Sequence, residues 1–538
     1  MGIFDKAKAF LTSPDTHKAI KDAALAGRDA AVVAGQKAAE LSKAAIAEYQ
    51  KQQEAAKAAQ PAHPAKSGNG KLDEMKKKIV DHHHAATSDQ HMRGSIVVHA
   101  DHEKAIQMMR GKREHLQLQI GNVPIPAADE QQHFLLAGAP GTGKSVTIKS
   151  MLAVIRDREE KAIVFDPGGD MVSTFYRPGI DYILNPLDAR DIGWNLWNDL
   201  ERHEYVAFSK AIVPDPTGQS DPFWATSGQA VLQALLITCR DLDQLLYAGL
   251  AGDDSELMTL VRKAGKTGLV GQEKTFSGVR ANLSGELDKL SVLRNTPATE
   301  ALSLKQWVGN NHDKGWVFLS ANKSHLESLK PLIRVWIDTV ARAAMSLKPD
   351  KSRRIWSVID ELPSLGKIPA LQAVMAEGRR FGLSSILGIQ NTPQLRETYG
   401  KDGGISLLAL PKTQLILRVA DAETQDEMSK LLGEKQIKRT VHSHTPGTWQ
   451  GGGSNSESEN VSIERAVLPS EIGALPDLVG YLRIGGENLI ARVRIPTDEI
   501  PHETEPGFIP EPQRQMPWED NEDWHKERSH TSDEAGKV

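Results

Sequence analysis

Short apolar runs recur along the middle of this 538-residue chain, and stretches with helical periodicity separate them. Runs of three to seven residues, rich in Ile, Val, Leu and Phe, are typical of strands that are buried on both faces of a parallel sheet. Because strands and helices alternate, the pattern predicts an α/β fold with a mostly parallel central sheet. The expected strands, in chain order, are SIVVH, LQLQI, VPI, HFLLA, AIVF, YIL, WVFL, IWSVI, SSILGI, TQLILRV and GYLRI.

One long stretch lacks this alternation. Residues 200–304 have helical periodicity and contain no strand-like run. We therefore expect an all-α domain that is inserted into the α/β domain, so that residues 93–199 and 305–500 form the two parts of the latter.

The first 92 residues differ in composition from the rest. Residues 1–60 are rich in Ala, Lys, Glu and Gln, and the pair Ser13-Pro14 favours the start of a helix. Large apolar residues are sparse here, so this helix either docks on a partner or oligomerises, or else it is a solvated spacer. Residues 61–92 are predicted to be a linker. The adjacent histidines at positions 82–84 could bind a metal, but such a run in a polar stretch is more often solvated.

Two segments near the C-terminus are predicted to be irregular. Residues 447–460, with the sequence GTWQGGGSNSESEN, are expected to form a low-complexity loop. Residues 501–538 are rich in Pro and acidic residues, and we expect them to form a disordered acidic tail.

Composition limits the function classes. No stretch approaches the roughly 18 uninterrupted apolar residues of a membrane span, and the N-terminus lacks a signal-peptide core, so we expect a cytoplasmic protein. The single cysteine, Cys239, excludes an internal disulfide and lies in an apolar segment that predicts a buried thiol. Since the net charge is −5, any contact with nucleic acid requires a locally basic surface.

A complete phosphate-loop motif, G-x-x-x-x-G-K-S, follows the run HFLLA. After it, apolar residues recur at the spacing of a helix with one buried face, at Ile148, Met151, Leu152 and Ile155. Strand, glycine loop and helix therefore follow in the order that phosphate binding requires. Lys144 is expected to reach the β- and γ-phosphates of ATP, and Ser145 to hold Mg²⁺. The predicted nucleotide-binding residues are Gly138, Ala139, Pro140, Gly141, Thr142, Gly143, Lys144, Ser145 and Val146.

Two carboxylates end the run IWSVI, and the carboxyl ends of parallel strands face the ligand crevice of such a sheet. Asp360 is therefore expected to bind Mg²⁺, directly or through water, and Glu361 to polarise the attacking water. Gln390 ends the next strand and is placed to sense the γ-phosphate or the water. Asp360 follows Lys144 by 216 positions. This separation exceeds what a small nucleotide kinase needs, and it favours a motor whose insertion handles a substrate.

Basic residues suggest further roles. Arg379 and Arg380 close a predicted helix, where an arginine could stabilise transition-state charge in a neighbouring subunit or act as an ordinary C-terminal helix cation. Two local basic clusters could neutralise DNA phosphates, although such clusters are more often solvated surface. These clusters are Arg262, Lys263 and Lys266, and Lys351, Arg353 and Arg354.

Taken in order, several segments resemble those of the coupling proteins of type IV secretion, the conjugative DNA-transport ATPases of the TraD and TrwB type in the RecA-like FtsK/HerA superfamily. The resemblance implies a RecA-like P-loop motor domain, an all-α domain that faces the cytoplasm, and a ring of six subunits around a channel for single-stranded DNA. It also implies that DNA stimulates the hydrolysis of ATP. The segments, between about Arg93 and Ile495, are GNVPIPAADEQQHFLLAGAPGTGKS, IVFDPGGDM, ILNPLD, WSVIDELPSLGKIPAL, EGRRFGLSSILGIQNTPQLRETYG and VLPSEIGALPDLVGYLRI.

The same resemblance assigns roles and partners. It places Gln390 in the third nucleotide motif and makes Arg379 the expected arginine finger. The implied partners are relaxosome proteins and components of the secretion channel. The residues that match the nucleotide motifs are Lys144, Ser145, Asp360 and Glu361.

Proteins of this type usually begin with a pair of membrane helices, whereas residues 1–60 fill that place here. We therefore expect the chain to dock on a membrane-anchored partner at the inner face of the bacterial inner membrane, or to have had its anchor lost or replaced. Two other functions stay open. One is a double-stranded DNA translocase of the FtsK type, and the other is a receptor and assembly scaffold in which nucleotide is only a conformational switch.

Overall fold

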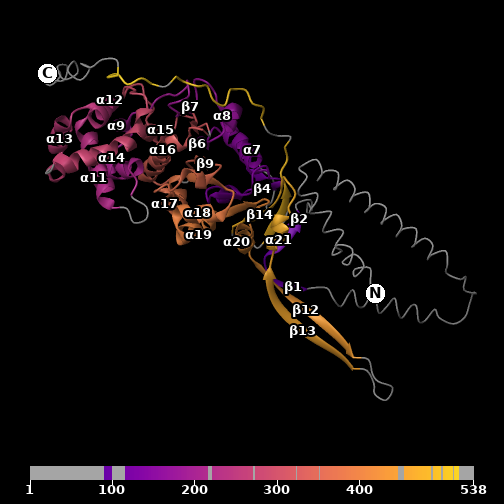
Figure 1. Cartoon of the computed structure of the whole chain (residues 1–538). Coiled ribbons are helices and arrows are strands. Elements are labelled where there is room, and N and C mark those ends of the chain that lie inside the picture. The colour runs from indigo at the N-terminus through magenta and orange to yellow at the C-terminus, as the bar shows by residue number, and fades with distance from the viewer. Residues whose placement is uncertain are drawn as a thin grey trace, which may run out of the picture. The chain divides into compact units, whose positions relative to one another are not determined.

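Figure 1 shows the chain as a computed structural model. The structure describes residues 90–99, 116–215, 221–270, 273–322, 324–350, 352–445, 454–485, 489–497, 501–512 and 514–519. The predictions for residues 1–60, for the adjacent histidines and for most of the linker lie outside these residues, and so does Lys351. The last three residues of the predicted linker, 90–92, belong instead to strand β1 (Gln90–Gly94), because they pair with a strand from the C-terminal half of the chain.

Ten strands of the described residues form one central sheet in the order β2-β15-β14-β11-β5-β10-β9-β6-β8-β7. Strand β14 runs antiparallel to both of its neighbours, and the other neighbouring pairs are parallel. The mostly parallel sheet that the apolar runs predicted is therefore confirmed, although β15 was not among the predicted strands. The strands are β2 (Ile96–His99), β5 (Phe134–Ala137), β6 (Lys161–Asp166), β7 (Tyr182–Ile183), β8 (Val317–Ser320), β9 (Ile355–Ile359), β10 (Leu383–Ile389), β11 (Thr413–Ile416), β14 (Val479–Ile484) and β15 (Leu489–Arg494). The runs LQLQI and VPI supply a separate pair, β3 (Gln119–Ile120) and β4 (Val123–Pro124).

Both faces of the central sheet are buried, as continuous apolar strands require. In β5, Phe134 and Leu136 belong to one hydrophobic core, whereas Leu135 and Ala137 belong to a second core on the opposite face. Helix α7 (Lys144–Asp157) packs in the first core, and its four predicted core residues are 0–1% exposed. The other helices of the α/β domain are α6 (Ala127–Glu130), α8 (Asp170–Phe175), α16 (Leu326–Ser346), α17 (Leu371–Glu377), α18 (Thr392–Tyr399), α19 (Lys401–Ala409), α20 (Ala422–Leu432) and α21 (Pro469–Gly473).

The described residues between β7 and β8 form helices and no strand, in agreement with the helical periodicity of residues 200–304 (Figure 1). Cys239 is buried among them, as predicted, and burial raises the pKa of its thiol to about 12. The helices are α9 (Leu196–Asp199), α10 (Tyr205–Ile212), α11 (Pro222–Thr238), α12 (Leu242–Leu246), α13 (Asp254–Lys263), α14 (Glu273–Ser291) and α15 (Leu304–Gly309).

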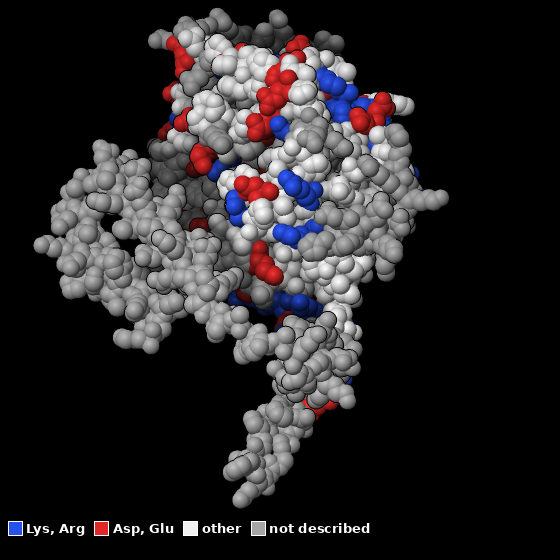
Figure 2. Space-filling model, turned by 90° about the vertical axis from the view of Figure 1, so that its right-hand side faces the viewer, with Lys and Arg blue, Asp and Glu red and all other residues white. Residues whose placement is uncertain are grey.

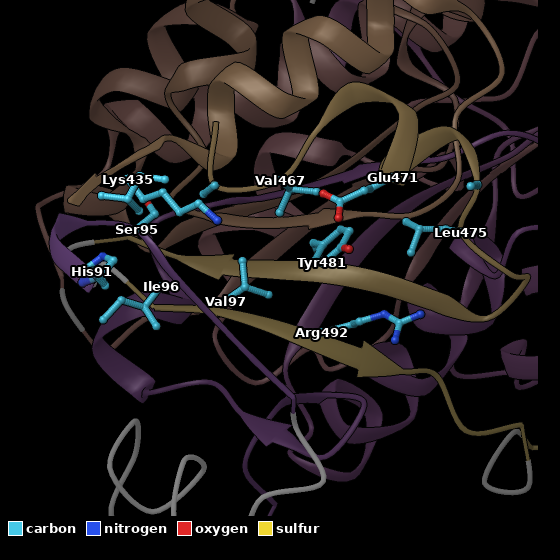
Figure 3. A pocket seen from close by; sticks show the side chains of 13 residues that line it. His91, Ser95, Ile96, Val97, Lys435, Val467, Glu471, Leu475, Tyr481 and Arg492 are labelled. Carbon is cyan, nitrogen blue, oxygen red and sulfur yellow. The ribbon is translucent and has the colours of Figure 1, made fainter. Parts of the chain in front are cut away.

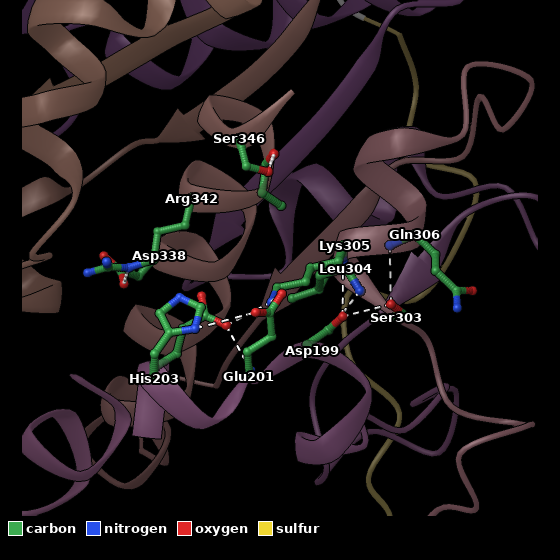
Figure 4. A network of polar contacts seen from close by, with 12 residues as sticks. Asp199, Glu201, His203, Ser303, Leu304, Lys305, Gln306, Asp338, Arg342 and Ser346 are labelled. Atoms are coloured by element: carbon green, nitrogen blue, oxygen red, sulfur yellow. Dashed lines mark hydrogen bonds and ion pairs between the residues drawn. The ribbon is translucent and has the colours of Figure 1, made fainter. Parts of the chain in front are cut away.

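Asp199 joins the two ends of this helical region. Its buried carboxylate accepts a hydrogen bond from the Ser303 hydroxyl at 2.7 Å and from the main-chain amides of Leu304 and Lys305 at 2.8 and 3.0 Å (Figure 4). A charged acceptor with this many donors forms strong hydrogen bonds. The segment that enters the helical region and the segment that leaves it are therefore held together at Asp199.

A long antiparallel ribbon, here called the arm, extends from the sheet edge (Figure 1). It consists of β12 (Glu434–Thr445) and β13 (Ser454–Arg465), which pair along twelve residues. The predicted loop at 447–460 is therefore wrong for residues 454–460. Their Ser- and Asn-rich sequence has low strand propensity, but pairing with β12 and cross-strand ion pairs such as Lys438–Glu459 at 2.6 Å stabilise the ribbon.

The C-terminal segment is also more ordered than predicted. We call residues 501–519 the strap. Its described part runs along the protein to the helical region (Figure 1, yellow). Its main chain bonds to residues 187–189, where the Ala189 amide donates to the Ile509 carbonyl at 2.8 Å. At its end, the Trp518 ring lies 5.7 Å from the ring of Tyr247. The predicted disordered tail is therefore wrong for residues 501–519, because long-range contacts hold them, and residues 520–538 lie outside the described part.

No helix among the described residues is both long and apolar enough to cross a membrane.

Candidate functional site

The phosphate loop joins β5 to α7, as the sequence predicted. Two of its glycines have a positive φ, +78° at Gly141 and +115° at Gly143, where other residues are strained. Gly138 is required for a different reason, because a Cβ at this position would lie 2.7 Å from the Thr142 hydroxyl oxygen. The Ala139 amide donates to the Arg418 carbonyl at 2.8 Å, which ties the loop to the sheet.

A cavity of about 480 Å³ opens over this loop, within the size range of pockets that hold small molecules. Seven of the nine predicted nucleotide-binding residues line it. The other two are Gly138 and Thr142. Thr142 is fully buried, and its hydroxyl donates to the Ala139 carbonyl at 2.7 Å, so it shapes the loop from within.

The two predicted carboxylates meet the loop at the carboxyl ends of neighbouring strands. Strand β10 lies between β5 and β9, and all three are parallel, so their ends converge. The Lys144 Nζ atom lies 3.1 Å from Glu361 Oε2 and 3.7 Å from Asp360 Oδ1. The Ser145 hydroxyl donates to Asp360 Oδ2 at 2.7 Å. Four residues chosen from separate sequence motifs thus form one contiguous polar cluster.

Gln390 lines the same cavity and makes a side-chain hydrogen bond with Glu361. Arg379 does not line it. It lies exposed, together with Arg380, in the 3-10 helix η5 (Gly378–Phe381). The structure thus brings Gln390 to the cluster of Lys144 and the two carboxylates, and it leaves Arg379 outside the cavity of its own chain.

Burial determines the electrostatics of the site. It raises the pKa of the Glu361 carboxyl above its usual value, and the charge of Lys144 and the hydrogen bonds from Lys144 and Gln390 act in the opposite direction. Asp166, at the end of β6, also lines the cavity. Burial raises its pKa to about 6, although its carboxylate accepts hydrogen bonds from the amides of Met171 and Val172 at 2.8 Å.

Several cavity residues received no role from the sequence. For Asp166 the signal was present, since an acidic residue ends the apolar run AIVF just as Asp360 follows IWSVI. Leu478 gave no signal. It has a strained φ of +62°, and its side chain covers the loop, because a Cβ at Gly143 would lie 2.9 Å from Leu478 Cδ2. The cavity residues without an earlier role are Phe165, Asp166, Pro167, Gly168, Asp170, Met171, Leu326, Ser364 and Leu478.

The donor set at Ser145 and Asp360 fits Mg²⁺, which prefers oxygen ligands. Asp360 Oδ1 is buried and accepts no hydrogen bond from the described residues, and its charged neighbour, Lys144 Nζ, lies 3.7 Å away, so this oxygen keeps its capacity to bind a cation. The described residues contain no cluster of three or more His, Cys, Asp or Glu side chains that could hold a metal. A nucleotide-bound Mg²⁺ does not need one, since phosphates and water complete its shell.

A larger cavity, of about 730 Å³, lies at the base of the arm and is lined by residues of β1, β2, β12, β14, β15 and α21 (Figure 3). None of the phosphate-loop residues lines it. Its wall mixes apolar groups with a few charged ones, such as Glu471 and Arg492, and Glu471 points toward Tyr481 (Figure 3). Its lining includes basic residues such as Lys435 and Arg492, but it contains neither the phosphate loop nor the carboxylate pair. The smaller cavity, which contains both, is therefore the candidate active site.

The proposed DNA-contacting clusters are not confirmed. Arg262 and Lys263 are exposed at the end of α13, and Lys266 donates to the Gln233 side chain at 3.0 Å. Arg353 donates to the carbonyls of Lys348 and Phe381, which indicates a structural role. On the face shown in Figure 2, the described basic side chains lie in small groups interspersed with acidic ones.

Comparison with known proteins identifies relatives of this chain. Residues 117–496 match the family model of the type IV secretion-system coupling protein DNA-binding domain. The chain is 29% identical over 416 residues to the coupling protein TraD of Escherichia coli K12, and the match covers 75% of this chain and 58% of TraD. The chain thus spans little more than half the length of this relative.

Solved structures agree with this match. The unbound conjugative coupling protein TrwB lacking its N-terminal 70 residues has a TM-score of 0.68 and 28% identity, and the alignment covers 78% of this chain and 96% of that one. TrwB in complex with ADP and Mg²⁺ has a TM-score of 0.67 and 28% identity, with coverage of 79% and 97%. The predicted RecA-like P-loop fold with an added all-α region is therefore confirmed.

Proposed function

The chain belongs to the family of type IV secretion-system coupling proteins, and on this premise we propose that it is an Mg²⁺-dependent ATPase that moves single-stranded DNA into a secretion channel. The observation that carries the proposal is the contact of Lys144 and Ser145 with the carboxylate pair at the end of β9. The complex of the related TrwB with ADP and Mg²⁺ supports nucleotide and Mg²⁺ as the ligands of this site.

Each side chain of the cluster has a role in this proposal. Lys144 and the loop amides bind the β- and γ-phosphates. Ser145 and Asp360 hold Mg²⁺, which when bound neutralises charge on the phosphate oxygens. Glu361 accepts a proton from the attacking water, and Gln390 orients Glu361 through their hydrogen bond.

Arg379 acts in trans in this proposal. It is exposed and absent from the cavity of its own chain, so it can reach the site of a neighbouring copy in a ring of six subunits. An arginine supplied in trans contributes about 10³–10⁵ in rate in related phosphate chemistry. The proposed motor domain comprises residues 93–199 and 305–500, and the proposed all-α domain residues 200–304.

The proposed partners are single-stranded DNA, relaxosome proteins and components of the secretion channel. We propose that the protein works at the inner face of the bacterial inner membrane, where residues 1–60 bind a membrane-anchored partner. A pull-down with the full chain and with a chain lacking residues 1–60 tests this docking. Equal recovery of the membrane partner by both would contradict it.

Phosphate release with and without single-stranded DNA tests the proposed activity. We expect DNA to stimulate turnover, and we expect Lys144→Ala to abolish it, because the phosphates lose their cation. Glu361→Gln should lower turnover by about 10²–10⁴-fold while nucleotide still binds. Lys149→Ala on the same helix α7 is the matched control, because Lys149 does not line the cavity, and it should retain turnover.

Three outcomes would contradict the proposal. Equal turnover with and without DNA would show that the protein is not a DNA-stimulated motor. Unchanged turnover in Lys144→Ala would show that ATP is not hydrolysed at this site. Tight nucleotide binding with negligible turnover in the unaltered protein would favour the scaffold with a nucleotide switch. Competition between duplex and single-stranded DNA separates the proposed motor from a double-stranded DNA translocase.

A further inference from the structure

A charged groove lies where the helical region meets the α/β domain. It encloses about 360 Å³ between α10, α16 and the loop at residues 366–369 that follows the carboxylate strand. We call it the Arg334 groove. Its floor is apolar, with Phe208 and Val335, and its rim carries charged side chains. The charged residues are Glu204, Lys210, Asp215, Arg334, Asp338, Arg342 and Lys367.

The three carboxylates of the groove are already paired. Asp338 accepts from Arg342 at 2.5 Å on the same helix (Figure 4). Glu204 pairs with Lys305 at 2.7 Å, and Asp215 lies 3.6 Å from Lys210. Two cations, Arg334 and Lys367, therefore remain without a carboxylate partner among the described residues.

Arg334 carries this excess charge in a partly buried place. Its Nε atom is buried and has no hydrogen-bond partner among the described residues. Burial lowers the pKa of its guanidinium, and the neutral Tyr399 phenol nearby cannot replace a carboxylate. A partly desolvated cation without a charged partner is costly, and a negatively charged ligand in the groove would offset this cost.

The groove is connected to the candidate active site through a short segment. Glu361 is followed by the 3-10 helix η4 (Leu362–Leu365), by Gly366 and by Lys367. Gly366 abuts Arg334, since a Cβ there would lie 3.2 Å from Arg334 Nη1. Beyond Lys367, the Ala370 amide donates to Asp338 on α16 at 2.8 Å. A ligand that bridges Arg334 and Lys367 would thus pull on the segment that carries Glu361.

We propose that the Arg334 groove binds a phosphate of the DNA backbone, with Arg334 and Lys367 as its contacting cations. This proposal rests on the proposed function, and it adds the site at which the strand is held. A planar guanidinium matches the paired oxygens of a phosphate, and Lys367 adds a flexible second charge. The groove also lies within residues 117–496, which match the DNA-binding domain of the family.

Anisotropy of a fluorescein-labelled oligo(dT) strand, titrated with the full chain at several salt concentrations, tests the groove. Each phosphate contact contributes about 0.7 to the slope of log K against log salt for a single strand. We expect Arg334→Gln and Lys367→Gln each to reduce the slope by about that amount. Lys401→Gln is the matched control, because Lys401 is exposed and does not line the groove, and it should keep the slope.

One further variant, Arg334→Lys, and the melting temperature of Arg334→Gln separate binding from folding. Arg334→Lys keeps the charge but loses the planar fork, so it should preserve the slope and weaken binding severalfold. Arg334→Gln should melt at the same temperature as the unaltered protein or higher, because it removes an unpaired buried charge. A melting temperature that falls by several degrees would show that Arg334 is structural, and the proposal would be wrong.

The remaining outcomes assign the groove to another ligand or reject it. If the unaltered protein binds DNA and all variants have the same salt slope, the groove is not a DNA-binding site, and the proposed function is unaffected. If the unaltered protein binds no DNA, both fail. If Arg334→Gln weakens binding of polyglutamate but not of oligo(dT), the ligand is an acidic protein segment. If it changes only the subunit number in light scattering, the groove is a contact between copies. Both results overturn the DNA assignment.

Discussion

The substitution Gly388→Ala offers a sharp test of how the sheet positions the active site. Gly388 lies in β10, between Leu136 of β5 and the end of β9. A Cβ at Gly388 would overlap the main-chain oxygen of Asp360 and would lie 2.6 Å from its carbonyl carbon. The obstacle is backbone and not a flexible side chain, so the two strand ends must separate.

The expected cost follows from this geometry. Overpacking of a buried site costs about 1–3 kcal/mol. The displaced strand end carries Asp360 and Glu361, and a misplacement of about 1 Å at a reacting site costs on the order of 10²-fold in rate. We therefore expect Gly388→Ala to lose about 10²-fold in turnover, which is more than its loss of stability alone would explain.

The assay combines steady-state phosphate release with thermal unfolding of the same preparation. Gly285→Ala is the control, because Gly285 is exposed in α14 and a Cβ there meets nothing within 4 Å. That variant should gain roughly 0.5–1 kcal/mol from helix propensity and keep its turnover. If Gly388→Ala has the melting temperature and the turnover rate of the unaltered protein, the close contact between β10 and β9 does not hold the carboxylates in place.

Three further changes have defined outcomes. Burial raises the pKa of Glu361 above its ordinary 4.5 in the nucleotide-free protein, and the base must be ionised. The value of kcat/KM should therefore fall as pH is lowered through a midpoint above 4.5, and a midpoint at or below 4.5 in the pH profile of kcat/KM would contradict this. Ser145→Ala should raise the Mg²⁺ concentration needed for half-maximal turnover, because it removes the hydroxyl oxygen that lies beside the Asp360 carboxylate. An unchanged Mg²⁺ titration would rule out Ser145 and Asp360 as the ligand pair. Arg514→Gln removes an ion pair with Asp243 and a 2.7 Å hydrogen bond to the Leu293 carbonyl. The substitution should lower the free energy of unfolding by about 1–3 kcal/mol and speed amide hydrogen exchange across residues 501–519. Unchanged exchange would show that other contacts hold the strap.

The signals for the candidate site are local in the sequence. Each motif is a contiguous run, and one rule brings the runs together, since parallel strands present their carboxyl ends at one edge. That rule predicts that Asp360, Glu361 and Gln390 lie beside the phosphates that Lys144 binds, and all four residues line one cavity. The same rule also applies to Asp166, which ends β6 and lines the cavity.

Other features depend on contacts that a local pattern does not encode. Residues 454–460 look like a loop, and they form a strand only because β12 lies beside them. The strap looks disordered, but distant residues such as Tyr247 hold it. The proposed role of Arg334 rests on the absence of a carboxylate partner among the described residues, and this absence can be recognised only when its neighbours are placed in space.

The arm has a consequence for how copies of the protein meet. Strand β13 pairs with β12 on one side, and its outer side has no partner strand among the described residues. Val461 and Ile463 are 47% and 67% exposed on this strand. An unpaired strand of this length is a template to which a further strand can add through main-chain hydrogen bonds. Concentrated samples should therefore self-associate through the arm, and a proline at an outward-facing amide of β13 should keep them dispersed.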